Sequence, residues 1–173
     1  GKDYLELLYI RHCIILFMIE LLKKLSPKDK PVFIINYNWY TMPKNMYEVF
    51  DEFELANSQQ EKLLVIQNNL SKTLVETLRL TYHPGFQWLV HEMPHNYKIP
   101  DIPPGLSFCQ LGTELRKLYL FQKGNPTAEN LDPRKQNELL IQLLESLEPR
   151  EAEVVIGIFK KDQGVDGLTY DFV

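Results

Sequence analysis

The string most suggestive of chemistry is His91-Glu92-Met93-Pro94-His95, which fits the H-E-x-x-H pattern of zinc proteases. That chemistry needs two histidines one turn apart on a helix, so that both imidazoles bind zinc while the glutamate polarises a bound water. Pro94 lies between them, lacks the N–H that would bond to Val90, and disfavours helical angles at Met93. We therefore interpret the match as chance and expect no metal site.

A second string, Lys160-Lys161-Asp162-Gln163-Gly164, comes close to the K-x-D-G motif of nucleotidyltransferases, whose lysine is the covalent nucleophile. Glutamine stands where that motif requires glycine, and the string falls at the end of a predicted helix. Lysines there are favourable to the helix dipole. The sequence also contains no glycine-rich phosphate loop and no C-x-x-C pair. We expect no catalytic residue, no cofactor and no enzymatic activity.

The elements that hold these strings are predicted to be short helices, which begin at Met46. Serine or aspartate caps, prolines at first helical positions and apolar residues at helical spacing mark their positions. The predicted helices cover residues 47–56, 58–70, 71–82, 109–122, 132–147 and 149–161, with a further turn or two at 86–92. Residues 97–106 contain three prolines and are expected to form an extended loop. The fold class is therefore an all-α, multi-helix domain.

The sequence also predicts three details of these helices. The helix over 58–70 has an expected inward stripe of residues at helical spacing, Leu63, Leu64, Gln67 and Leu70. The run Lys123-Gly124-Asn125 is expected to stop the helix over 109–122, with either Gly124 or Asn125 in the left-handed conformation. Gly164 is expected to close the helix that ends in Lys160 and Lys161.

Residues 1–45 form a separate N-terminal extension in this interpretation, and residues 46–173 form the domain. The extension holds an apolar helix over 3–25 and a short strand at Val32–Ile35. The helix either packs on its own domain or docks on another protein. Met46 is a candidate natural start, which would make residues 1–45 translated upstream sequence and Gly1 a cloning scar.

The longest apolar run, Cys13–Ile19, is shorter than the roughly 20 residues of a membrane span. It lacks the cleavage pattern of a secretory signal. Two cysteines in a chain of this length fit a reducing compartment. We therefore expect a cytoplasmic protein with no membrane contact, in the host cytoplasm if a phage encodes it.

The net charge of −4 is unevenly distributed. Residues 1–45 contain seven Lys and Arg against four Asp and Glu, a balance of +3, so residues 46–173 carry −7. A domain with a negative net charge is not attracted to a polyanion at long range. Any contact with nucleic acid must therefore come from a local basic patch or from backbone amides.

Several segments, taken in order, resemble a known family. The clearest is Arg79-Leu80-Thr81-Tyr82-His83-Pro84-Gly85-Phe86-Gln87-Trp88 followed by Pro94, and others are Lys123-Gly124-Asn125 and the stretch from Glu151 to Gly164. Together, over residues 46–173, they resemble the N-terminal DNA-binding domain of tailed-phage ATP-dependent DNA ligases. The chain is also similar to a small family of marine tailed-phage proteins without an assigned function, which is interpreted as this domain standing alone.

The resemblance implies an all-α domain that grips duplex DNA, nicked or intact, through the minor groove without reading sequence. Loops and helix starts in that family present backbone amides and basic side chains to phosphates. Carried over by position, the nucleic-acid contacts are Lys123, Gly124, Asn125, Lys161, Gly164 and Arg79. The two loops around Asn125 and Gly164 are expected to lie side by side with free amides.

The chain departs from the family at two points. The ligases have a basic pair before the proline, where this chain has His91-Glu92, and this chain lacks the catalytic domain that follows in the ligases. The family also implies a short segment after Val173, so the reading frame is a candidate for truncation. The first difference, together with the balance of −7, keeps an alternative open, in which the same helical fold is a protein-interaction module without nucleic-acid binding.

Overall fold

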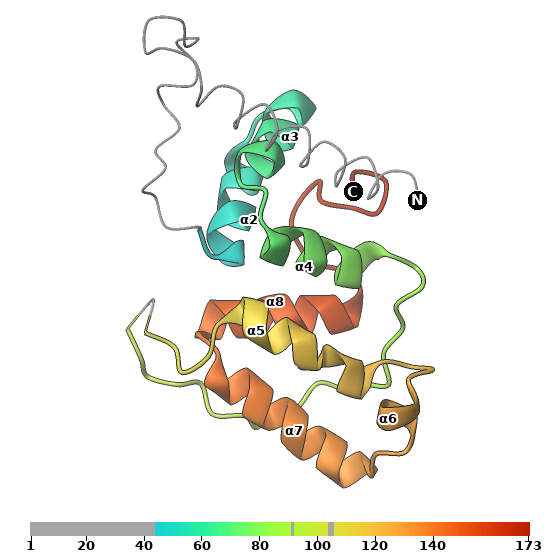
Figure 1. Cartoon of the computed structure of the whole chain (residues 1–173). Coiled ribbons are helices and arrows are strands. Elements are labelled where there is room, and N and C mark those ends of the chain that lie inside the picture. The colour runs from blue at the N-terminus through green and yellow to red at the C-terminus, as the bar shows by residue number, and fades with distance from the viewer. Residues whose placement is uncertain (1–43, 91, 104–105) are drawn as a thin grey trace, which may run out of the picture. The chain divides into compact units, whose positions relative to one another are not determined.

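The computed structural model describes residues 44–90, 92–103 and 106–173, and the described residues from Lys44 onward form one unit. Figure 1 shows its helices, which in chain order are α2 (Met46–Leu55), α3 (Gln59–Asn68), α4 (Lys72–Tyr82), α5 (Leu111–Glu114), the 3-10 helix η2 (Leu115–Phe121), α6 (Pro126–Glu129), α7 (Pro133–Ser146) and α8 (Pro149–Lys160). The described ranges contain no strand, only an isolated antiparallel bridge between Trp88 and Gln122. A mostly helical fold is therefore confirmed for this part of the chain. The expected helix over 3–25 and strand at 32–35 lie outside the described residues.

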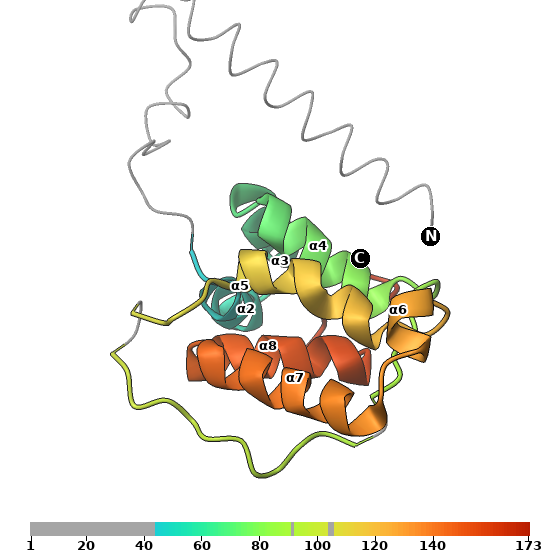
Figure 2. The ribbon, with the colours of Figure 1, turned by 60° about the horizontal axis from the view of Figure 1, so that its bottom comes forward.

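Helix α8 lies at the centre of this unit. It contacts α2, α4 and α7, and Figures 1 and 2 both show it between α7 on one side and α2 with α4 on the other. Its side chains at Ala152, Val155 and Ile158 have no exposed surface. Full burial of a side chain as large as those of Val155 and Ile158 stabilises the fold by roughly 1.5–3 kcal/mol. Because α8 packs against helices on several sides, the core fixes the positions of its two ends. The loops that flank α8 therefore start from fixed positions.

Local signals in the sequence set the helix starts. Ser58 accepts a hydrogen bond from the Glu61 amide (3.2 Å), and Ser71 accepts one from the Leu74 amide (3.1 Å). Asp132 caps α7, with Pro133 as its first residue. Such caps are each worth about 1 kcal/mol, because they satisfy amides that have no partner within the helix. The predicted starts of α3, α4 and α7 are confirmed.

Three expected features differ from the structure. Leu63 and Leu64 are exposed, whereas α3 buries Ile66 and packs Leu70 against the core, so its inward face is rotated from the expected stripe. Residues 86–90 are not helical, since the backbone there pairs with Gln122 and its neighbours. The single helix expected over 109–122 is a turn of α-helix followed by the 3-10 helix η2, with Leu111, Leu115, Leu118 and Phe121 buried.

Candidate nucleic-acid interface

The first candidate loop follows η2 and leads into α6. Gly124 has a φ of 84°, so glycine and not Asn125 takes the left-handed conformation. Asn125 instead caps α6, with its Oδ1 accepting the Thr127 amide at 2.9 Å and Pro126 in the first turn. The side chain of Lys123 is exposed and has no hydrogen-bond or ion-pair partner within the described part of the chain. This loop therefore offers one exposed cation at a tight turn.

The second candidate loop follows α8. The residue that ends this helix in the left-handed conformation is Lys161 (φ 61°), and Gly164 takes positive φ only three residues later (66°). The amides of Lys161 and Asp162 bond back to the carbonyls of Ile158 and Gly157 at 3.1 and 3.0 Å, the usual way of satisfying the last carbonyls of a helix. The expectation that Gly164 itself closes the helix is therefore wrong by three residues.

Both loops are attached to the segment 83–89 that follows α4. The Lys123 amide donates to the Gln87 carbonyl (2.8 Å), and the Lys161 ammonium donates to the His83 carbonyl (2.8 Å). Between them, the Phe159 ring stands edge-on to the rings of Trp88 and Phe121, at 5.2 and 5.5 Å. Figures 1 and 2 show the ends of η2 and α8 at the same side of the unit, next to α6. Lys123 and Lys161 thus lie at one end of the unit, whereas Gly164 lines a pocket with Phe50 and Arg150 between α2 and α8.

The backbone amides of the two glycines are not free. The Gly124 amide donates to Glu129 Oε1 and the Gly164 amide donates to Asp162 Oδ1, both at 2.9 Å. The expectation of unbonded amides is wrong for these two residues, because a carboxylate close in sequence folds back onto each. A phosphate could reach either amide only by displacing a carboxylate that repels it. Exposed cationic side chains are therefore better placed than these two amides to contact a phosphate.

Two of the candidate cations are already engaged. The Lys161 ammonium donates to the Leu80 and His83 carbonyls at 3.3 and 2.8 Å, and burial lowers its pKa. The Arg79 guanidinium bonds both oxygens of Glu76 at 3.0 and 2.6 Å and lies 4.6 Å from the centroid of the Phe86 ring. Both therefore stabilise the α4 end and its connection to α8. The Arg79 charge is paired with that of Glu76, whereas the Lys161 ammonium is half-buried and held by two backbone carbonyls.

Lys160 was missed by positional carry-over from the ligases. It is exposed in the last turn of α8, one residue before the engaged Lys161, and has no partner within the described ranges. The helical spacing held a signal for it, since Val155 and Phe159 face the core and leave Lys160 on the outer face. Lys123 and Lys160 are thus the two open cations of the two loops.

The first of the two strings that resemble catalytic motifs is described only in part. His91 lies outside the described residues, and Glu92 and His95 are exposed in a segment without helix. No group of three or more His, Cys, Asp or Glu among the described residues is placed to hold a metal ion. None of the described helices combines the length and the apolar content needed to cross a bilayer.

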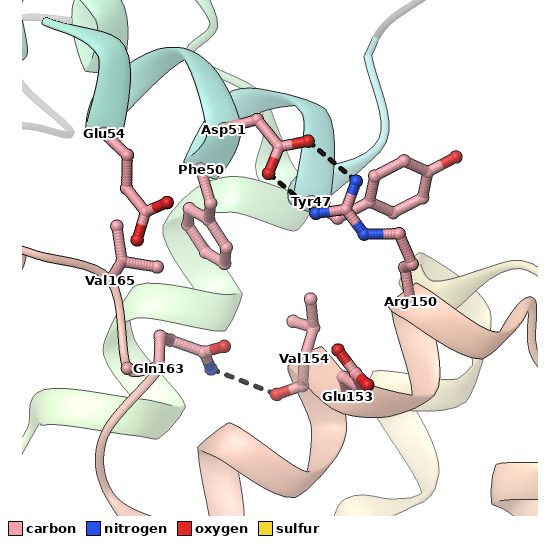
Figure 3. Close-up of a pocket in the computed structure, with 10 residues that line it drawn as sticks. Tyr47, Phe50, Asp51, Glu54, Arg150, Glu153, Val154, Gln163 and Val165 are labelled. Atoms are coloured by element: carbon pink, nitrogen blue, oxygen red, sulfur yellow. Dashed lines mark hydrogen bonds and ion pairs between the residues drawn. The ribbon is translucent and has the colours of Figure 1, made fainter.

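A pocket of about 170 Å³ lies between α2, α8 and the segment after α8 (Figure 3). On one wall the Arg150 guanidinium donates two parallel hydrogen bonds to Asp51, at 2.7 and 2.6 Å, and lies 4.7 Å from the centroid of the Tyr47 ring. The hydrogen bonds from Arg150 lower the pKa of Asp51. No sequence motif marked this pocket, because its residues come from segments about a hundred positions apart.

Two carboxyl groups are buried at the start of α8. Glu148 is 8% exposed and Glu151 is 7% exposed, and Glu148 Oε2 has no hydrogen-bond partner among the described residues. Burial, and then repulsion from Glu148, raises the pKa of Glu151 to about 7. Near neutral pH this carboxyl group therefore carries a proton for much of the time, unlike a glutamate in water.

Comparison with known proteins gives one match. The model of a family described as "Family of unknown function (DUF6433)" matches residues 49–165. This range includes both candidate loops and all the helices from α3 to α8. No curated protein and no solved structure matches the chain.

Proposed function

We propose that this chain, which belongs to the DUF6433 family of unknown function, is a non-catalytic module that binds duplex DNA without reading its sequence. The observation that carries the proposal is that Lys123 and Lys161 both donate hydrogen bonds to the segment 83–89, so the open cations Lys123 and Lys160 lie at one end of the described unit. Phosphate contacts of this kind position a protein on DNA without specifying sequence. The ordered resemblance to the DNA-binding domain of phage DNA ligases supports the same partner.

The expected binding mode is weak and strongly dependent on salt. Residues 46–173 carry a balance of −7, so attraction is local and each lysine contributes a phosphate contact with counterion release. The Glu129 and Asp162 carboxylates already hold the loop amides, which keeps the number of phosphate contacts small. We therefore expect dissociation constants in the micromolar range or weaker at about 50 mM salt.

Charge reversal of Lys123 and Lys160 tests this proposal. The double variant K123E/K160E is expected to bind a labelled nicked duplex of about 20 base pairs at least about tenfold more weakly than the unaltered chain, and to reduce the salt slope by about 2. Fluorescence anisotropy at about 50 and 200 mM salt measures both. Lys98→Glu is the control variant, because Lys98 is exposed in the loop between α4 and α5. We expect this variant to bind the duplex with an affinity within about twofold of that of the unaltered chain. Absence of binding at low salt, or equal losses in all variants, would overturn the proposal.

A protein-interaction module on the same fold is the second candidate. The observation that favours it is the exposure of Leu55, Leu63 and Leu64 on α2 and α3, at 79%, 40% and 52%. Exposed apolar side chains on successive helices are typical of interaction surfaces when they are contiguous. If the chain is such a module and associates with itself, size-exclusion chromatography with light scattering gives a mass larger than that of one chain. A monomer that binds DNA supports the first candidate instead.

A further inference from the structure

The pocket between α2 and α8 has an apolar floor and a charged rim. Phe50 and Val154 are 5% and 4% exposed, and with Val165 they form its apolar lining. Figure 3 shows Glu54 from α2 and Glu153 from α8 on opposite sides of the opening, with Phe50 and Val154 between them. A volume of about 170 Å³ accommodates one long side chain and not a nucleotide or a helix.

The charges around the pocket are unbalanced. Three carboxylates line it, from Asp51, Glu54 and Glu153, against the single cation of Arg150. Asp51 already holds Arg150 through both of its oxygens. Glu54 accepts only one long hydrogen bond, from the Asp166 amide at 3.4 Å, and Glu153 accepts none from the described residues. Two carboxylates therefore face the opening without a cation, which excludes a phosphate or another anion as the ligand.

We propose that this pocket binds the side chain of an arginine on a protein partner. An arginine that lies along the pocket, rather than entering it tip first, places its apolar three-carbon stem against the floor and its planar cation at the carboxylates of the rim. Its five N–H donors let one guanidinium bond carboxylates on two sides, whereas a lysine ammonium is a compact point charge on a flexible stem. The pocket shares Gly164 with the loop of the proposed DNA contacts, but its ligand has the opposite charge, since those contacts bind phosphate anions.

The test uses the full chain and three short peptides. Acetylated Gly-Arg-Gly amide, its citrulline analogue and its lysine analogue are titrated at low salt into 15N-labelled protein. The arginine peptide is expected to shift the backbone amides of Phe50, Val154 and Val165 in a saturable way. The citrulline peptide, which has the same shape without the charge, is expected to bind at least about tenfold more weakly, and the lysine peptide at least about threefold more weakly.

Variants of the rim locate the site. E54Q/E153Q removes both open charges from exposed positions, and we expect the arginine peptide to bind it at least about fivefold more weakly. Glu138→Gln, an exposed change on α7 outside the pocket, is expected to leave the affinity within about twofold. The proposal is overturned if the pocket amides do not respond, if citrulline or lysine binds as well as arginine, or if E54Q/E153Q binds like the unaltered chain.

Discussion

Replacing Phe53 by alanine is expected to lower the free energy of unfolding by about 3–5 kcal/mol, the usual cost of deleting a buried phenyl ring. Phe53 has no exposed surface, and its ring stands edge-on to that of Phe172 at 5.0 Å, so it connects α2 to the C-terminal segment. The Lys62 ammonium lies 4.9 Å from the centroid of the same ring. A cavity there would loosen both contacts. Urea denaturation followed by circular dichroism measures the change as a lower midpoint.

Leu55 is the matched control, because it lies two residues further along α2 and is 79% exposed. Leu55→Ala is expected to change the free energy of unfolding by less than about 0.5 kcal/mol. The denaturant slope of both variants is expected to match that of the unaltered chain. A loss below about 1 kcal/mol for Phe53→Ala would contradict the packing of α2 described above.

Replacing Glu151 by glutamine is expected to stabilise the protein at pH 8 by about 2–3 kcal/mol. Burial favours the protonated carboxyl group, so the pKa is about 7 in the folded chain against 4.5 when exposed. Below pH 4.5 both states hold the proton and ionisation costs nothing. As the pH rises from 4.5 through 7 the unfolded chain releases its proton first, so the folded state loses stability. Glutamine never ionises and avoids this loss.

The pH profile separates this effect from a change in packing. Thermal or urea unfolding between pH 4 and pH 8 is expected to show a stabilisation by Glu151→Gln that is absent at pH 4 and complete by about pH 8. Glu153→Gln, an exposed change in the same helix, is expected to alter stability by less than about 0.5 kcal/mol at either pH. A stabilisation that is the same at both pH values, or none at pH 8, would contradict the burial of a proton-binding carboxyl group.

The sequence was informative where structure depends on neighbours in the chain. The caps Ser58, Ser71 and Asp132 each act on the amide three residues away, so their types and spacing predicted the starts of α3, α4 and α7. The inward face of residues 111–121 was also predictable, since two successive spacings of three residues fit both an α-helix and the 3-10 helix that is present. Local hydrogen bonding and spacing are readable without knowing the fold.

The errors come from interactions that spacing does not contain. Leu63 and Leu64 fit a helical stripe, but which stripe of α3 faces inward depends on where α2 lies. The segment at Trp88 was expected to be helical and is extended, because its partner, Gln122, is 34 positions away. Long-range contacts therefore decided both features against local preference.

The candidate site was predictable in part. The glycine and asparagine that follow the helix predicted a left-handed residue at Gly124 or Asn125, and Gly124 takes that conformation. The carboxylates that accept hydrogen bonds from the loop amides were overlooked. Asp162 lies two residues before Gly164, a spacing at which an aspartate side chain commonly binds a backbone amide, so this signal was present. The pocket beside Arg150 could not be found, because its partner Asp51 is 99 residues away.

The central claim is that the loop at Lys123 and the end of α8 at Lys160 together form one surface that meets duplex DNA. Its most direct test is a titration of the 15N-labelled full chain with a nicked duplex at low salt, followed amide by amide. We predict that the amides of Lys123, Gly124, Lys160 and Lys161 change their chemical shifts together, while those of α3 keep theirs. Shifts confined to one loop, to α3, or to no residue at all would contradict it.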